Sequence, residues 1–90
     1  MKAEFKNSFA KDLKKIKGKD VKDQVKQVIE SVERAKSVQE IKNVKKLRGG
    51  DKYYRIRVGD YRVGITLEND VVAFIRCLHR KDIYRYFPEK

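Results

Sequence analysis

The stretch from Tyr53 to Ile65, YYRIRVGDYRVGI, constrains the fold of this 90-residue chain more than any other segment. Two runs of alternating residues flank Gly59 and Asp60, and a two-residue loop with glycine first suits a tight antiparallel hairpin. A loop of this length also fixes the register of the two strands. We therefore predict an antiparallel strand pair in which Arg57 lies directly opposite Arg62.

Side chains alternate between the two faces of a strand, so this register assigns each residue of the hairpin to a face. The predicted core face carries Tyr54, Ile56, Val58, Tyr61, Val63 and Ile65. The other face is basic and carries Tyr53, Arg55, Arg57, Arg62, Gly64 and Thr66. Like charges directly opposite each other destabilise a strand pair by up to about 1 kcal/mol. The basic face is therefore either a solvated surface whose arginine stems cover apolar atoms or a phosphate-binding surface. Gly64 leaves space for a backbone or a ligand to approach.

Two amphipathic helices are expected before this hairpin. Asn7 or Ser8 can cap the first helix, which Gly18 is predicted to end, and Asp20 is predicted to cap the second. Apolar residues recur at helical spacing along both: Phe9, Leu13 and Ile16, then Val21, Val25, Val28, Ile29, Val32 and Ala35. Strands are predicted at residues 2–6, 44–47, 53–58, 61–67 and 71–78, with a loop at 37–42.

The predicted order β-α-α-β-β-β-β specifies an α+β fold. We expect an N-terminal helical hairpin packed on one face of a mainly antiparallel four- to five-stranded sheet. A chain of this length without a linker or repeat is expected to form one domain, residues 1–90.

Charge dominates the composition. The chain has 24 Lys and Arg residues against 13 Asp and Glu residues, a formal net charge of +11. This excess indicates a partner such as nucleic acid, the ribosome, an anionic membrane or an acidic protein. A single cysteine, Cys77, in an apolar strand is interpreted as a buried structural thiol, and a single histidine, His79, argues against a metal site. No cofactor is expected, and without a signal peptide or an apolar membrane span the expected compartment is the cytoplasm.

The C-terminal segment LHRKDIYRYF places several chemically useful side chains directly after the last long strand: His79, Arg80, Tyr84 and Tyr86. Histidine can transfer protons near neutral pH, and tyrosine can stack on a base. Arginine can stabilise negative charge that develops on a phosphate. A strand end beside a basic sheet is a suitable place for such groups because the sheet positions them rigidly.

With KKLRGGDKYYRIRVGDYRVGI, LHRKDIYRYF and the two preceding helices, nearly the whole chain resembles the RelE branch of the RelE/ParE toxin superfamily. The resemblance implies a RelE-like fold and a type II toxin–antitoxin toxin that enters the ribosomal A site and cuts messenger RNA. It implies a metal-independent endoribonuclease in which the ribose 2′-OH attacks the adjacent phosphate and leaves a 2′,3′-cyclic phosphate and a 5′-OH end.

The resemblance also implies a set of site residues. Arg55, Arg57 and Arg62 would clamp phosphate and Arg80 would face the scissile phosphate, with Tyr84, or alternatively Tyr86, as the C-terminal tyrosine. The family pattern has lysines at the first two positions, and arginine does not deprotonate in proteins, so His79 becomes a candidate proton acceptor. Further RNA contacts are expected from Lys46, Arg48, Tyr53, Lys81 and Tyr86.

The implied partners are an acidic RelB-like antitoxin, the ribosome with its messenger RNA, and operator DNA bound only through the antitoxin complex, with no membrane. Two other functions are compatible with the same resemblance. One is inhibition of DNA gyrase by a ParE-like member, because a shared fold does not fix function. The other is nucleic-acid binding by a catalytically weak member.

Overall fold

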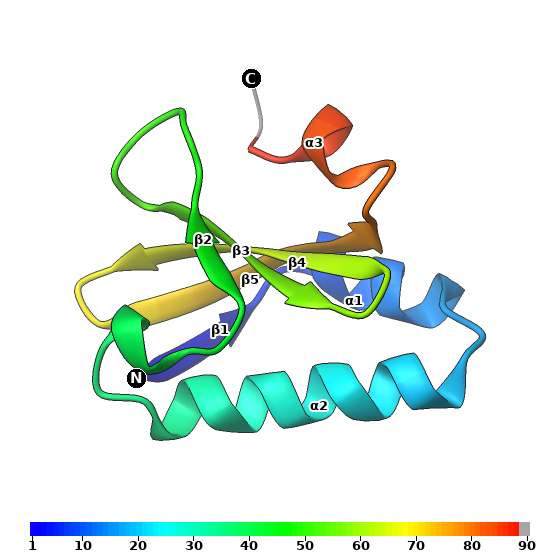
Figure 1. The fold of residues 1–90 in the computed structure, drawn as a ribbon, viewed down its shortest axis with the longest axis horizontal. Coiled ribbons are helices and arrows are strands. Elements are labelled where there is room, and N and C mark those ends of the chain that lie inside the picture. Colours follow the sequence, from blue (N-terminus) through cyan, green and yellow to red (C-terminus); the bar gives the residue numbers. More distant parts are fainter. Residues whose placement is uncertain (89–90) are drawn as a thin grey trace.

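The computed structural model describes residues 1–88 and forms a five-stranded sheet with helices on both sides (Figure 1). The elements, in chain order, are β1 (Lys2–Phe5), α1 (Asn7–Lys15), α2 (Lys19–Arg34), a 3₁₀ turn (Val38–Glu40), β2 (Val44–Lys46), β3 (Tyr53–Val58), β4 (Tyr61–Glu68), β5 (Val71–His79) and α3 (Ile83–Tyr86). The strand order is β1-β5-β4-β3-β2, with β1 parallel to β5 and every other pair antiparallel. The predicted α+β class and mainly antiparallel sheet are confirmed.

The central hairpin has the predicted register. Arg57 pairs with Arg62 and Arg55 pairs with Gly64 across β3 and β4. Gly59 has a φ of +59°, which a glycine in the first position of a two-residue loop adopts without strain.

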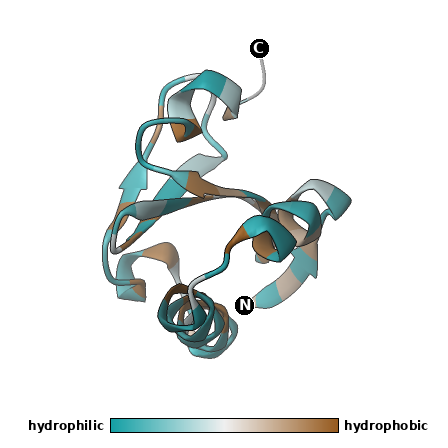
Figure 2. Cartoon of the chain, turned by 90° about the vertical axis from the view of Figure 1, so that its right-hand side faces the viewer, coloured by the Kyte–Doolittle hydropathy of each residue, from teal (hydrophilic) through white to brown (hydrophobic). Residues whose placement is uncertain are grey.

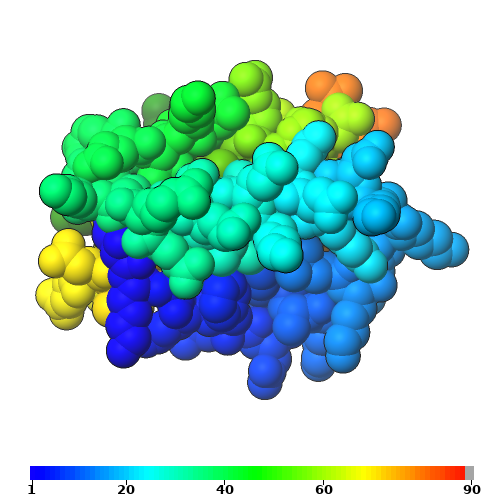
Figure 3. Space-filling model, turned by 90° about the horizontal axis from the view of Figure 1, so that it is seen from below, coloured from blue at the N-terminus to red at the C-terminus, as the bar shows by residue number. Residues whose placement is uncertain are grey.

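The sheet lies between two unequal layers. Helices α1 and α2 cover one side, and seen from below they and β1 occupy most of the surface (Figure 3). Figure 2 shows α2 end-on beneath the sheet and the C-terminal segment on the opposite side. The main core lies between the sheet and the two helices, and its buried members include Phe9, Val25, Val32, Ile56, Val63, Ile65 and Phe74. Within residues 1–88, no helix is long and apolar enough to cross a membrane.

The predicted helix ends are wrong in their details. Helix α1 stops at Lys15, because Ile16 is buried in extended conformation and takes the chain off the helix before Gly18. Gly18 instead precedes α2 with a φ of −78°, and Asp20 lies in the first turn of α2, where its charge suits the helix dipole. Neither helix has a side-chain N-cap hydrogen bond, and Ser8 instead donates to the carbonyl oxygen of Ile75 at 2.6 Å.

Strand β5 contains an irregularity that decides which way its last residues point. Gly64 pairs with Arg76 and Ile65 pairs with Phe74, so Ile75 is an extra residue in β5. An extra residue of this kind reverses the alternation of faces beyond it. Cys77 consequently lies on the helix side opposite Val63, whereas Arg76 lies on the same side as Arg55 and Gly64.

Candidate functional site

The side of the sheet away from α1 and α2, here called the arginine side, carries the predicted basic cluster. Arg55, Arg57 and Arg62 lie on it in the predicted register. Lys45 pairs with Arg55 across β2 and β3 and therefore belongs to the same side. The loop between β2 and β3 and the helix α3 both rise above this side of the sheet (Figure 1). The cluster therefore lies between two flanking segments.

Neutral oxygens hold the three arginines of the cluster. The Arg55 Nη1 donates to the Asn43 carbonyl oxygen at 3.0 Å, and the Arg57 Nη2 donates to the Asn43 Oδ1 at 3.3 Å. The Arg62 Nη1 donates to the carbonyl oxygens of Gly59 and Tyr61, both at 2.9 Å. Within residues 1–88 the three arginines make no ion pair with a carboxylate, and the buried Arg55 Nε has no hydrogen-bond partner. Three positive charges thus remain available to an anion.

Asn43 holds two arginines of the cluster, and sequence reasoning missed it. Its φ is +62°, a left-handed conformation that asparagine adopts more readily than most residues. Its backbone and side-chain oxygens together orient Arg55 and Arg57. An asparagine directly before the short strand β2 was the available signal, but only the fold shows that it lies beside two arginines.

Arg76 is a fourth arginine on this side of the sheet, and it differs from the cluster. Its Nε lies 2.7 Å from the Asp12 Oδ2 and its Nη2 lies 3.1 Å from the Asp12 Oδ1, which makes a bidentate ion pair. The backbone N–H of Cys77 donates to the same carboxylate at 2.9 Å. The charge of Arg76 is therefore compensated within the protein, unlike those of the cluster.

Phe87 fills the space at Gly64 that was expected to admit a backbone or a ligand. A Cβ placed on Gly64 would lie 2.6 Å from the Phe87 ring, so the glycine makes room for this side chain. Phe87 is buried, and Tyr53 meets its ring edge-on at a centroid distance of 5.9 Å. The C-terminal segment of the protein itself, and not a ligand, occupies the space at Gly64, because this segment folds back over the sheet.

The two candidate tyrosines of the C-terminal segment are exposed, whereas two of its apolar residues are buried. Ile83 and Phe87 are buried, whereas Tyr84 and Tyr86 are 54% and 47% exposed. The Tyr86 ring lies against Arg76, with the guanidinium carbon 5.3 Å from the ring centroid. Tyr84 is therefore the more accessible of the two aromatic rings.

His79 is not brought to the arginine cluster. It pairs with Tyr61, whose neighbours on the same face are core residues, and the two rings meet edge-on at 5.7 Å. Its Nδ1 accepts a hydrogen bond from the backbone N–H of Lys81 at 3.2 Å. The structure thus places the candidate proton acceptor on the helix side of the sheet.

The remaining candidates lie outside the arginine cluster. Arg80 and Lys81 are exposed in the turn after β5, where the Arg80 N–H donates to the Asp60 carbonyl oxygen at 2.7 Å. Arg48 is exposed in the loop after β2. Lys46 pairs with Tyr54, which directs it to the helix side, and its Nζ lies 3.7 Å from the Asp51 carboxylate. Lys45 replaces it as the β2 residue on the arginine side.

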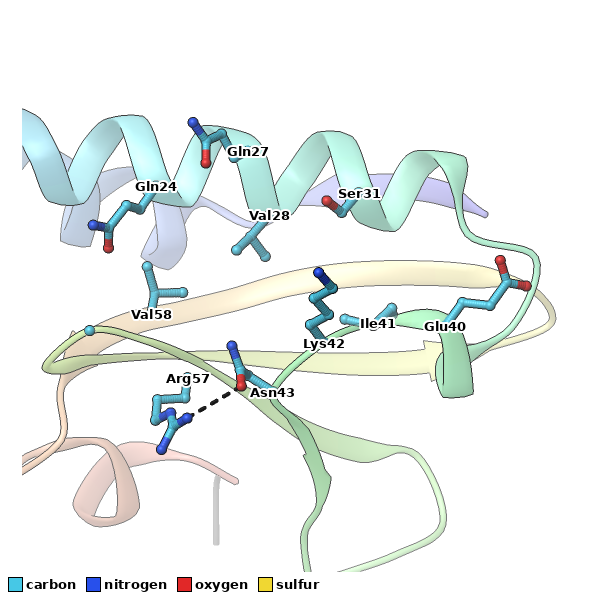
Figure 4. A pocket seen from close by; sticks show the side chains of 11 residues that line it. Gln24, Gln27, Val28, Ser31, Glu40, Ile41, Lys42, Asn43, Arg57 and Val58 are labelled. Atoms are coloured by element: carbon cyan, nitrogen blue, oxygen red, sulfur yellow. Dashed lines mark hydrogen bonds between the residues drawn. The ribbon is translucent and has the colours of Figure 1, made fainter.

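A cleft of about 370 Å³ adjoins the cluster, between α2 and the edge formed by β2 and β3 (Figure 4). Arg57 and Asn43 line its rim, with the hydrogen bond between them drawn in Figure 4. Val28 and Val58 supply apolar surface, while Gln24, Gln27, Ser31, Glu40 and Lys42 supply polar groups. Arg57 is therefore accessible from both the arginine side and this cleft.

Two further kinds of chemistry find no support in the geometry. Burial, and secondarily the charge of Asp12, raise the pKa of the Cys77 thiol to about 12, so this cysteine is a poor nucleophile. Across residues 1–88 there is no group of three His, Cys, Asp or Glu side chains that could hold a metal ion.

Comparisons with known proteins give one consistent result. Residues 3–84 match the model of the ParE toxin family, described as the ParE toxin of the type II toxin–antitoxin system. The chain is 45% identical to Toxin RelE3 of Methanocaldococcus jannaschii over 98% of its own length and 100% of the relative. It also matches the RelB–RelE antitoxin–toxin complex from Methanococcus jannaschii, with 42% identity, a TM-score of 0.79 and coverage of 94% of this chain and 99% of the other. The isolated Escherichia coli RelE toxin shares the fold at 24% identity and a TM-score of 0.66, over 87% of this chain and 82% of that one.

Proposed function

We propose that this chain cleaves messenger RNA in the A site of the ribosome. The chain belongs to the ParE toxin family of type II toxin–antitoxin systems and is a RelE-type toxin. The observation that carries the proposal is the cluster of Arg55, Arg57 and Arg62, whose charges are held only by neutral oxygens. Planar guanidinium groups are well suited to phosphate because they donate two parallel hydrogen bonds.

The proposed reaction is an internal transfer within the RNA. The ribose 2′-oxygen forms a bond to the adjacent phosphorus as the bond to the 5′-oxygen breaks. The 2′-OH loses a proton and the departing 5′-oxygen gains one, which leaves a 2′,3′-cyclic phosphate and a 5′-OH end. Negative charge builds on the phosphate during this exchange, and preorganised donors stabilise it.

The residues on the arginine side are proposed to stabilise the charge of the phosphate and to position it. Arg55, Arg57 and Arg62 clamp the phosphate, and Arg80 approaches it from the turn after β5. Because arginine does not deprotonate and His79 lies on the helix side, we do not assign the proton acceptor to the cluster. Much of the rate would then come from the ribosome, which holds the codon in a reactive geometry.

RNA binding is proposed to extend from this cluster onto the flanking segments. Tyr84 offers an exposed ring for stacking on a base. Arg48 and Lys81 add exposed positive charge on either side. Lys45 is added to this set because it pairs with Arg55 and so lies on the arginine side. The proposed RNA contacts also include Tyr53, Lys46 and Tyr86, whose side chains already contact other residues of the protein.

The proposed inhibitor of this activity is an acidic antitoxin. The solved relative from Methanococcus jannaschii is a RelB–RelE complex, and a net charge of +11 favours a negatively charged partner. Operator DNA would be bound through that antitoxin complex.

A translation reaction with purified ribosomes and a defined messenger RNA tests the proposal. We expect cuts within the A-site codon that require ribosomes, and we expect Arg80→Ala to lower the cleavage rate by about 10²- to 10³-fold, the usual effect of removing a charge-stabilising donor. Arg85→Ala is the matched control, because Arg85 is an exposed arginine on α3. Intact RNA in the presence of folded wild-type protein, or equal effects of the two substitutions, would refute the proposal.

The family match carries a second candidate function. The matching model is that of a ParE toxin, and we weigh gyrase inhibition as the alternative. Supercoiling by purified gyrase, measured with and without this protein, separates gyrase inhibition from RNA cleavage. Inhibited supercoiling together with intact messenger RNA would favour gyrase inhibition. RNA binding that leaves both gyrase and RNA unaffected would identify a catalytically weak member.

A further inference from the structure

Asp12 is a buried carboxylate in α1, remote in sequence from every proposed RNA contact. It is 4% exposed, and it is the buried charged side chain of residues 1–88. All its hydrogen bonds go to β5: two from the guanidinium of Arg76 and one from the backbone N–H of Cys77. A buried ion pair is a poor source of stability because both charges lose their hydration. The geometry of the Asp12–Arg76 ion pair is more informative, because it shows which groups the pair holds in place.

Arg76 connects this carboxylate to the C-terminal segment. The bidentate pair with Asp12 fixes the plane of the guanidinium group. The Tyr86 ring lies against that group at 5.3 Å, the geometry of a cation–π contact. A chain of contacts thus runs from α1 through β5 to α3.

Ile83, Tyr86 and Phe87 describe how α3 is rotated about its own axis. Ile83 and Phe87 are one turn apart and both are buried, so they fix the face of α3 that meets the sheet. Successive residues of a helix are about 100° apart, which puts Tyr84 and Tyr86 on opposite flanks of that buried face. Because Tyr86 lies beside Arg76 of β5, Tyr84 lies on the other flank of α3, away from Arg76.

We infer that Asp12 is a positioning residue that acts through Arg76 and Tyr86 to set α3, and with it the position of Tyr84. The consequence for Tyr84 rests on the proposed function. The positioning of α3 does not rest on it, and can be measured in the free protein.

Amide hydrogen exchange measures the positioning directly. The Phe87 N–H donates to the Ile83 carbonyl oxygen at 2.8 Å, so its protection reports the closed turn of α3. We expect Asp12→Asn to lower this protection by about 2- to 30-fold, the factor that corresponds to losing a cation–π contact, while amides of the core strands such as Ile65 keep theirs. Asp20→Asn, at an exposed acidic residue of α2, is the control and should leave Phe87 unchanged.

Two further variants separate positioning from general destabilisation. Arg76→Lys keeps a charge beside Asp12 but removes the planar group, so it should reproduce the loss at Phe87, and it also serves if Asp12→Asn does not fold. In a Tyr86→Leu background, Asp12→Asn should cause no further loss, because the contact through which it acts is gone. Unchanged Phe87 protection in folded Asp12→Asn or Arg76→Lys protein, or an equal loss at all amides, would overturn the inference.

The link to Tyr84 is tested in the ribosome assay. We expect Asp12→Asn to lower kcat with little change in KM, and Tyr84→Ala to remove most of the difference between the Asp12 variant and its parent. A persistent full effect of Asp12→Asn in the Tyr84→Ala background would refute the link. If the wild-type protein cleaves no RNA, the proposed function fails, and the exchange experiment still decides whether Asp12 positions α3.

Discussion

At the scale of the residue, Gly64 reports how closely the C-terminal segment packs on the sheet. Its hydrogen faces the buried Phe87 ring, and a Cβ there would lie at 2.6 Å, closer than packed atoms allow. We predict that Gly64→Ala lowers the free energy of unfolding by about 1–3 kcal/mol, the usual cost of overpacking. Urea denaturation of the variant and of the wild-type protein gives this value. A variant as stable as the wild-type protein would show that Phe87 does not pack on Gly64.

At the scale of the element, the paired strands β3 and β4 carry a conflict between stability and anion binding. Arg57 faces Arg62 directly, and like charges in that position destabilise a strand pair. We predict that Arg57→Gln raises the free energy of unfolding by up to about 1 kcal/mol at low ionic strength. Added sulfate should stabilise the wild-type protein more than the variant, because the ion can bridge the two arginines. Urea denaturation with and without sulfate tests this, with Arg85→Gln on α3 as the control. A variant that is less stable than the wild-type protein and responds equally to sulfate would mean that Arg57 and Arg62 do not bind an anion together.

The same hairpin shows what the sequence could predict about the elements and what it could not. A two-residue loop determines a register, so the positions of Arg55, Arg57 and Arg62 followed from the residues alone. The side on which His79 lies did not, because the extra residue Ile75 in β5 reverses the alternation and nothing local marks it. The helix ends were misplaced for a similar reason: the burial of Ile16, a tertiary effect, ends α1 before Gly18. The contacts of α3 with Gly64 and Arg76 join residues distant in sequence and required the fold.

At the scale of the whole molecule, the question is whether RNA responds to the net charge of +11 or to the arginine side in particular. Helices α1 and α2, on the opposite side of the sheet, also carry several exposed lysines, so a general electrostatic attraction would involve both surfaces. Binding through the arginine side would instead depend on a few charges at fixed positions.

Salt dependence distinguishes these two cases. For single strands, the logarithm of the binding constant falls with the logarithm of the salt concentration by about 0.7 for each phosphate contact. We predict that Arg57→Gln weakens the binding of a short single-stranded RNA, made uncleavable by 2′-deoxy substitution, and reduces this slope by about 0.7. Lys26→Gln, at an exposed residue of α2, removes the same charge and should change neither quantity. Fluorescence anisotropy over a range of salt concentrations gives both values. Equal changes in the two variants would mean that the molecule attracts RNA through its total charge, and that the arginine side is not a specific binding surface.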